Sequence, residues 1–164
     1  MANKIFGLIG KNIDYSFSKK YFTERFENTN ATDCIYQNFD IDTIEDFPDL
    51  ITKNPDLMGL NVTIPYKETI IPYLDCLSKK ATQIGAVNVI RFTKKRKLKG
   101  YNSDYYGFKK SLESILQPHH QKALILGTGG ASKAVAFALK EMNIPYAFVS
   151  REAHENTITY ERIN

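Results

Sequence analysis

The sequence predicts an α/β protein with a mostly parallel sheet, because strand-like and helix-like segments alternate along the chain. Short apolar runs of strand length are separated by stretches in which apolar residues recur at steps of three and four. Strands that are joined through helices pair in parallel. A composition of 43% apolar and 24% charged residues is that of an ordinary globular protein. We therefore expect helices packed on a sheet around an apolar core.

The N-terminal part of the chain carries most of the strand signals. Apolar runs predict strands over residues 5–10, 34–39, 58–64, 86–92 and 98–102. Helical spacing predicts helices over 19–28, 43–54 and 70–80, and Pro48 should bend or shorten the second of them. An amphipathic helix is expected over 104–116, followed by a linker over 117–121. We place the boundary between an N-terminal domain, 1–103, and a second domain, 104–164, at the start of that helix.

A glycine loop follows the linker. An apolar strand over 122–126 runs into the loop, and a helix over 131–142 and a strand over 146–149 come after it. Glycines let a backbone turn tightly and approach phosphates, and the next helix offers free N–H groups. This order predicts the first part of a Rossmann-like dinucleotide-binding domain. Its expected cofactor contacts are Gly127, Thr128, Gly129, Gly130 and Ala131.

The alternative is an ordinary strand-to-helix turn, since Ser132 takes the place of the third glycine in Gly-x-Gly-x-x-Gly. About 20 positions beyond the loop, Ser150, Arg151 and Glu152 lie where a ribose or its 2′-phosphate would be bound. Arg151 favours a 2′-phosphate and therefore NADP. Glu152 argues for the free hydroxyl of NAD, because a carboxylate repels phosphate. The pattern leaves this choice open.

The most informative polar pattern is the stretch Asn61-Val62-Thr63-Ile64-Pro65-Tyr66-Lys67. Residues two apart face the same side of an extended backbone. Asn61, Thr63 and Pro65 should therefore share one face, which Lys67 continues if the chain stays extended. Such a face offers an amide, a hydroxyl and an ammonium to a small polyhydroxylated anion. The alternative is an edge strand that ends at a proline, with Lys67 in solvent.

Charge and composition argue against several other classes of function. The net charge of +4 is modest, and the basic run 94–97 lies between two predicted strands, where a solvated turn is expected rather than a nucleic-acid site. The two cysteines and three histidines lack the spacing of metal ligands. No apolar run has the length of a membrane span, and no secretory signal is evident. We therefore expect a cytoplasmic protein without metal, nucleic-acid or membrane partners.

Motifs along the whole chain resemble those of the shikimate dehydrogenase family. Ser16 and Ser18 resemble its paired-serine substrate motif, and the stretch 61–67 matches Asn-x-Thr-x-Pro-x-Lys at every fixed position. Segments 85–88 and 100–104 resemble Gly-Ala-x-Asn and Gly-x-Asn-Thr-Asp, with serine in place of the threonine. The loop 127–131 resembles Gly-Ala-Gly-Gly-Ala. Their shared order makes chance similarity a poor explanation.

The resemblance implies reversible, NADP-linked reduction of 3-dehydroshikimate to shikimate, a step of chorismate and aromatic amino acid biosynthesis. It implies a catalytic pair of Lys67, which exchanges a proton with the substrate oxygen, and Asp104, which orients the ammonium. From the residues alone, Asp104 could also cap the helix that follows, and the two roles are compatible. The resemblance implies that substrate is bound by Ser16, Ser18, Asn61, Thr63, Lys67, Asn88 and Asp104.

The end of the chain departs from a complete dinucleotide domain. Residues 119–164 supply only a strand, a helix, a second strand and a polar tail, whereas such a domain has two βαβαβ halves. We therefore expect a piece of a longer enzyme with weak or absent turnover of its own. The alternatives are a quinate/shikimate dehydrogenase that uses NAD and a shikimate-binding module without turnover. A folate-linked dehydrogenase ranks lower because its lysine motif differs, and a homodimer is compatible with the sequence.

Overall fold

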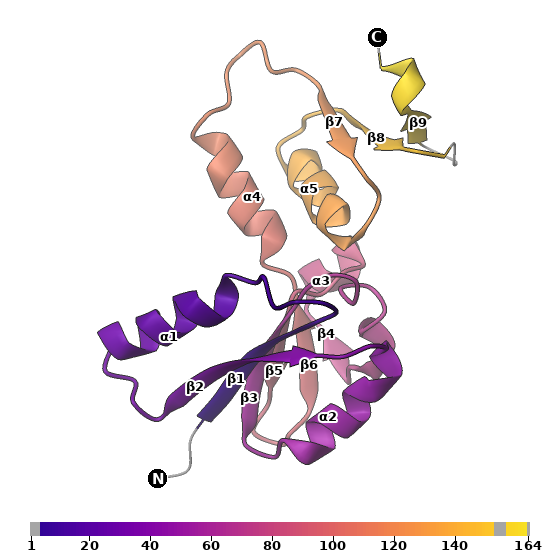
Figure 1. Ribbon diagram of the computed structural model, residues 1–164. Helices are drawn as coiled ribbons and strands as arrows, with labels where there is room; N and C mark the ends of the chain where they lie inside the picture. Colours follow the sequence, from indigo (N-terminus) through magenta and orange to yellow (C-terminus); the bar gives the residue numbers. More distant parts are fainter. Residues whose placement is uncertain (1–3, 153–156, 164) are drawn as a thin grey trace. The chain divides into compact units, whose positions relative to one another are not determined.

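The computed structural model describes residues 4–152 and 157–163 (Figure 1). These residues form two compact units. The first unit contains the chain up to Ser78 together with Val87–Tyr101, and the second contains Lys79–Ala86 and the chain from Asn102 onward. The domain boundary between residues 103 and 104 stays a prediction.

A six-stranded mixed sheet forms the centre of the first unit, in the order β2-β1-β3-β5-β6-β4. β1 pairs in parallel with β2 and β3, and β4 pairs in parallel with β6. β5 runs antiparallel to both β3 and β6. The expected α/β class with a mostly parallel sheet is confirmed. The strands are β1 (Lys4–Gly10), β2 (Cys34–Asp40), β3 (Leu57–Val62), β4 (Cys76–Leu77), β5 (Val89–Phe92) and β6 (Leu98–Tyr101).

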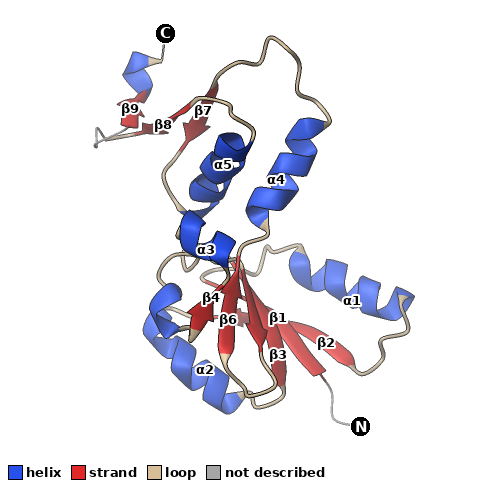
Figure 2. Ribbon diagram, turned by 180° about the vertical axis from the view of Figure 1, so that it is seen from behind, coloured by secondary structure: helices blue, strands red, loops and turns tan. Residues whose placement is uncertain are grey.

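Helices α1 (Ser18–Asn28) and α2 (Phe47–Lys53) lie on opposite sides of this sheet, as Figures 1 and 2 show. The strand order explains this, because the chain moves outward from β1 to β2 and then back past β1 to β3. Right-handed crossovers in opposite directions place their helices on opposite faces. α1 packs Phe22 and Phe26 against a cluster that contains Leu8 and Tyr36. α2 buries Phe47 and Leu50.

Two predicted helices differ in the structure. The segment 43–54 divides into a 3₁₀ turn, Ile44–Asp46, and α2, where Pro48 occupies the first turn and needs no N–H partner. The helix expected over 70–80 is wrong. That segment forms a 3₁₀ turn (Ile71–Tyr73), strand β4 and the start of α3 (Lys79–Ile84). The backbone N–H of Asp75 donates to Leu98 O, so pairing with a distant strand decides its conformation.

The second unit contains a three-stranded parallel sheet in the order β7-β8-β9. Its strands are β7 (Ala123–Leu126), β8 (Tyr146–Ser150) and β9 (Thr157–Thr159), and its longer helices are α4 (Asp104–Glu113) and α5 (Gly130–Glu141). β9 and the 3₁₀ turn Tyr160–Arg162 were missed, because Thr157-Ile158-Thr159 offers a single aliphatic residue. Among the described residues, no helix has the length and apolar character needed to cross a membrane.

Candidate functional site

The stretch from Asn61 to Lys67 begins at the carboxyl end of β3 and then turns. β3 ends at Val62, and the N–H of Tyr66 donates to Thr63 O at 2.9 Å. The extended face predicted to run through Pro65 to Lys67 is therefore wrong beyond the strand. Tyr66 is 4% exposed and its hydroxyl donates to Ile41 O at 2.7 Å, as expected of a packing residue. The turn replaces one extended face with a compact polar loop.

Backbone hydrogen bonds bring the predicted substrate residues of this loop together. The N–H of Thr63 donates to Ile9 O at 2.9 Å, which fixes the loop beside the end of β1. The N–H of Val62 donates to Asn88 O at 2.9 Å, and the N–H of Val87 donates to Lys67 O at 2.7 Å. These two hydrogen bonds hold the backbone of Lys67 next to the segment that contains Asn88. Both side chains are partly buried.

Gly10 permits this approach. A Cβ built at Gly10 would lie 2.5 Å from Ile13 Cγ2 and 2.6 Å from Thr63 Cγ2, closer than carbon atoms can approach. The last residue of β1 therefore has no room for a side chain while Thr63 is in place. Sequence reasoning used Gly10 only as a strand end.

The loop that carries Ser16 is held by residues of β2. The Asp40 carboxylate accepts the N–H groups of Asn12 and Ile13, each at 3.0 Å. The N–H of Ser16 donates to Ile13 O at 2.9 Å, and the Ser16 hydroxyl oxygen accepts the N–H of Ser18 at 3.3 Å. Ser16 thus takes part in the turn that precedes α1. Its partly buried position leaves a substrate role open as a prediction.

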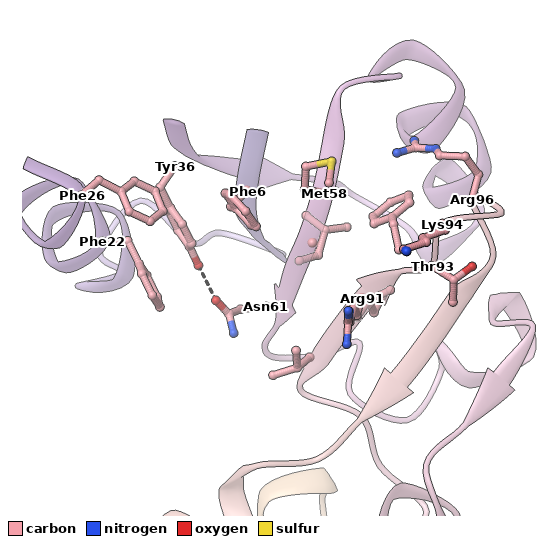
Figure 3. Close-up of a pocket in the computed structure, with 16 residues that line it drawn as sticks. Phe6, Phe22, Phe26, Tyr36, Met58, Asn61, Arg91, Thr93, Lys94 and Arg96 are labelled. Atoms are coloured by element: carbon pink, nitrogen blue, oxygen red, sulfur yellow. Dashed lines mark hydrogen bonds between the residues drawn. The ribbon is translucent and has the colours of Figure 1, made fainter. Parts of the chain in front are cut away.

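Tyr36 was missed by the sequence reasoning, although it contacts a predicted site residue. Its hydroxyl donates to Asn61 Oδ1 at 2.7 Å (Figure 3). Both side chains line a cavity of about 700 Å³ on the sheet of the first unit, together with mainly apolar residues such as Phe6, Phe22 and Leu60. Of the predicted substrate residues, Asn61 alone lines this cavity.

Asp104 is the first residue of α4, and the N-cap position belongs to Ser103. The capping role considered for Asp104 is therefore wrong. Asn102 supplies the cap instead, because its side-chain oxygen accepts the N–H of Tyr105 at 3.3 Å. Asn102 is 6% exposed and also donates from Nδ2 to Ala86 O at 3.0 Å. It links the Gly85–Ala86 segment to the start of the helix that carries Asp104.

The glycine loop has the geometry that a pyrophosphate needs. Gly127 has φ +105°, a conformation that side chains disfavour, and its N–H donates to Val149 O at 2.8 Å. A Cβ added at Gly129 would meet no atom within 4 Å, so the backbone there faces open space. α5 begins at Gly130, and its first N–H groups have no partner within the helix. These residues fit a dinucleotide phosphate.

Ser150, Arg151 and Glu152 follow the carboxyl end of β8, next to the end of β7 where the loop begins. The register pairs Leu126 with Val149, so the two segments leave the sheet at the same edge. Arg151 and Glu152 are both exposed. The structure therefore brings the predicted cofactor residues together within the second unit.

These features define the chain as an α/β protein in which one unit carries a polar loop cluster and the other a glycine loop between a strand and a helix. Residues 8–90, half of the chain, match the model of the shikimate dehydrogenase substrate binding domain. The chain belongs to the shikimate dehydrogenase family, and the predicted membership is confirmed.

Relatives agree with this assignment. Shikimate dehydrogenase (NADP(+)) of Clostridium botulinum is 42% identical over 160 residues, which are 95% of this chain and 61% of the relative. Shikimate dehydrogenase 1 from Peptoclostridium difficile is 34% identical, with a TM-score of 0.82 over 98% of this chain and 61% of its own. The Thermus thermophilus enzyme in complex with NADP(H) and shikimate is 32% identical, with a TM-score of 0.79 over 92% and 56%. The chain thus spans about three fifths of the length of its relatives.

Proposed function

We propose that this chain supplies the substrate-binding unit and the first part of the cofactor-binding unit of an NADP-dependent shikimate dehydrogenase. The reaction is the reversible reduction of 3-dehydroshikimate to shikimate, in chorismate biosynthesis. One observation carries the proposal: the family's Asn-x-Thr-x-Pro-x-Lys motif forms a loop whose backbone is bonded to Ile9, Val87 and Asn88. An edge strand with a solvated lysine would need no such backbone hydrogen bonds.

Substrate recognition is assigned to the polar groups around this loop. Hydroxyls and a carboxylate are matched by neutral hydrogen-bonding groups and one cation. Thr63 and Lys67 come from the loop itself, and Asn88 comes from the segment bonded to it. The complete proposed set is Ser16, Ser18, Asn61, Thr63, Lys67, Asn88 and Asp104.

Proton transfer is assigned to Lys67. Reduction of a ketone leaves an alkoxide oxygen, and the Lys67 ammonium gives it a proton. In the reverse direction the neutral amine of Lys67 takes the proton from the substrate hydroxyl. Asp104 holds the ammonium in the productive orientation and accepts a hydrogen bond from the substrate. When bound, NADPH supplies the hydride.

The cofactor is assigned to the second unit. The loop Gly127, Thr128, Gly129, Gly130 and Ala131 would hold the pyrophosphate at the start of α5, where the helix dipole favours an anion. Ser150, Arg151 and Glu152 would surround the ribose, with the Arg151 guanidinium on the 2′-phosphate. The two free cysteines, Cys34 and Cys76, suit a reducing cytoplasm, which we propose as its compartment.

Ligand-induced stabilisation tests the substrate half of the proposal with this chain. Shikimate should raise the free energy of unfolding by about 2.7 kcal/mol at one hundred times its dissociation constant. The matched control is Lys67→Gln, in which shikimate should stabilise far less. A melting temperature that shikimate leaves unchanged would contradict the substrate assignment.

Cofactor choice needs its own experiment, because Glu152 favours NAD and the second candidate is an NAD-linked quinate/shikimate dehydrogenase. NADP should bind more tightly than NAD, and Arg151→Ala should remove that difference by weakening NADP alone. Glu152→Gln should strengthen NADP binding further, since it removes a charge that repels phosphate. Tighter binding of NAD would favour the second candidate.

A further inference from the structure

Tyr36 holds a predicted substrate residue, Asn61, by a hydrogen bond within the first unit. It is 4% exposed, and its ring stacks on Phe22 with centroids 4.6 Å apart and planes 13° from parallel. Its hydroxyl points at Asn61 and donates to Oδ1 at 2.7 Å (Figure 3). Packing thus fixes the ring, and the ring fixes where the hydroxyl is directed.

The hydroxyl of Tyr36 has a single proton to donate, and Tyr36 gives it to Asn61. Burial raises the pKa of Tyr36 far above its ordinary value of 10.0. The Asn61 oxygen is therefore engaged as an acceptor, and its side-chain nitrogen remains as a donor.

We propose that Tyr36 is a positioning residue that makes the Asn61 side chain a hydrogen-bond donor to the substrate. The inference rests on the proposed function, because it assumes that Asn61 binds shikimate. With its oxygen held, the Asn61 amide turns its nitrogen away from Tyr36, as Figure 3 shows. That nitrogen is a donor for a substrate hydroxyl or carboxylate oxygen.

A tyrosine suits this task better than a group that titrates near neutral pH. Burial raises the pKa of Tyr36 above its ordinary value, so its hydroxyl stays protonated through the neutral range. The direction of the Tyr36–Asn61 bond is then independent of pH. Consecutive hydrogen bonds also polarise one another, so the Asn61 nitrogen becomes a somewhat stronger donor.

Tyr36→Phe tests the inference, because it removes the hydroxyl and keeps the stacked ring. We expect shikimate to bind this variant about two- to ten-fold more weakly, the effect of one lost neutral hydrogen bond. Tyr66→Phe is the matched control: Tyr66 is also 4% exposed and donates at 2.7 Å, but to the backbone oxygen of Ile41. It should lose a similar amount of stability and keep its affinity. Equal weakening in both variants would overturn the inference.

A double-mutant cycle that combines Tyr36→Phe with Asn61→Ala separates a positioning role of Tyr36 from a general loss of structure. In an Asn61→Ala background, Tyr36→Phe should cause a smaller fold-change in shikimate affinity than in the unaltered chain, because the side chain that Tyr36 positions is gone. Asn61→Asp keeps an acceptor for the Tyr36 hydroxyl but removes the donor. It should therefore fold normally and lose shikimate binding. Fully additive effects, or normal binding by Asn61→Asp, would overturn the inference.

A ligand-free measurement keeps this inference distinct from the proposed function. The side-chain NH₂ signals of Asn61, assigned by their loss in Asn61→Ala, should shift in the NMR spectrum of Tyr36→Phe and stay in place in Tyr66→Phe. If the unaltered chain fails to bind shikimate, the proposed function is wrong. Asn61 signals that Tyr36→Phe leaves unmoved would overturn the positioning role, whatever shikimate does.

Discussion

Asn102 shows how much one residue of a functional motif can do for structure. Its amide side chain is buried, with 6% exposed. It accepts from Tyr105 N and donates to Ala86 O, so it joins two segments distant in the sequence. Asp104, the proposed partner of Lys67, begins the helix that Asn102 caps. The motif therefore combines a residue for the fold with a residue for the chemistry.

We expect Asn102→Ala to lower the free energy of unfolding by about 2–3 kcal/mol, because two hydrogen bonds are lost and a buried carbonyl remains unpaired. Urea denaturation measures this loss. Ser111→Ala, at an exposed position of the same helix, should change stability by less than about 0.5 kcal/mol. Equal effects of the two substitutions would show that the bonds of Asn102 contribute little.

The sequence motifs identified candidate site residues but not the residues that hold them in place. Tyr36 falls within an apolar run and resembles a core residue in the sequence. Its bond to Asn61 depends on β1 lying between β2 and β3, with Phe6 paired to Tyr36 and Leu8 to Asn61. That register is a property of the sheet, and no local pattern near Tyr36 encodes it.

Elements with strong local signals were predicted well. β1, β2, β7, α1 and α5 lie within a few residues of their expected ranges, since apolar periodicity and glycine punctuation are local. β4 and β9 were missed because they are short and gain their conformation from pairing with β6 and β8. Strand pairing between distant residues overrides the weak preference of such segments.

Two glycine substitutions test how the end of β1 supports the polar loop. Gly10→Ala should destabilise the chain by about 1–3 kcal/mol, because the added methyl group meets Ile13 and Thr63. Shikimate binding should weaken as well, since Thr63 must move. Gly107→Ala is the matched control: it lies in α4, and its added Cβ meets no atom within 4 Å. That change should stabilise by about 0.5–1 kcal/mol. If Gly10→Ala and Gly107→Ala both destabilise the chain, the loss of a glycine would explain the effect, and the contact with Ile13 and Thr63 would not.

An acid-sensitive contact joins three helices of the second unit. Glu141 of α5 forms ion pairs with Lys80 of α3 and Lys109 of α4, and its side chain is 26% exposed. The hydrogen bond from Lys80 holds the pKa of Glu141 below its ordinary value of 4.5. The stabilisation is therefore complete above that ordinary value and is lost as the pH falls through the lowered pKa.

We expect Glu141→Gln to be less stable than the unaltered chain by about 0.5–1 kcal/mol near pH 7, the range of exposed ion pairs. The difference should shrink as the pH falls below 4.5 and the carboxylate becomes protonated. Urea denaturation at a pH near 7 and at one below 4.5 measures it. Glu113→Gln removes a more exposed pair with Lys110 and should have a smaller effect. A difference that is the same at both pH values would exclude the ion pairs as its source.

At the scale of the whole molecule, the sequence predicted two functional regions and the order in which they occur. The structure groups the candidate substrate residues mainly in the first unit and the cofactor residues in the second. Asp104 is the exception, because it belongs to the second unit while Lys67 belongs to the first. A motif assigns a role to each residue by itself. The proposed action of both residues on one substrate is a relation between residues distant in the sequence, which periodicity and spacing cannot encode.

A double-mutant cycle across the two units tests that relation. Lys67→Gln and Asp104→Asn should each weaken shikimate binding by about 1.5–3 kcal/mol, the range for hydrogen bonds to charged groups. If one bound shikimate engages both residues, the double variant should deviate from additivity by about 0.5–3 kcal/mol. Titration calorimetry of the four proteins measures this coupling.

Lys95→Gln provides the control for loss of one positive charge, since Lys95 is exposed at the tip of the β5–β6 hairpin. It should leave shikimate affinity unchanged. Because a shared ligand makes the remaining partner less useful once the other is gone, the second substitution should cost less than the first. Effects that add within about 0.3–0.5 kcal/mol would mean that the two residues act independently, and the proposed catalytic pair would be wrong.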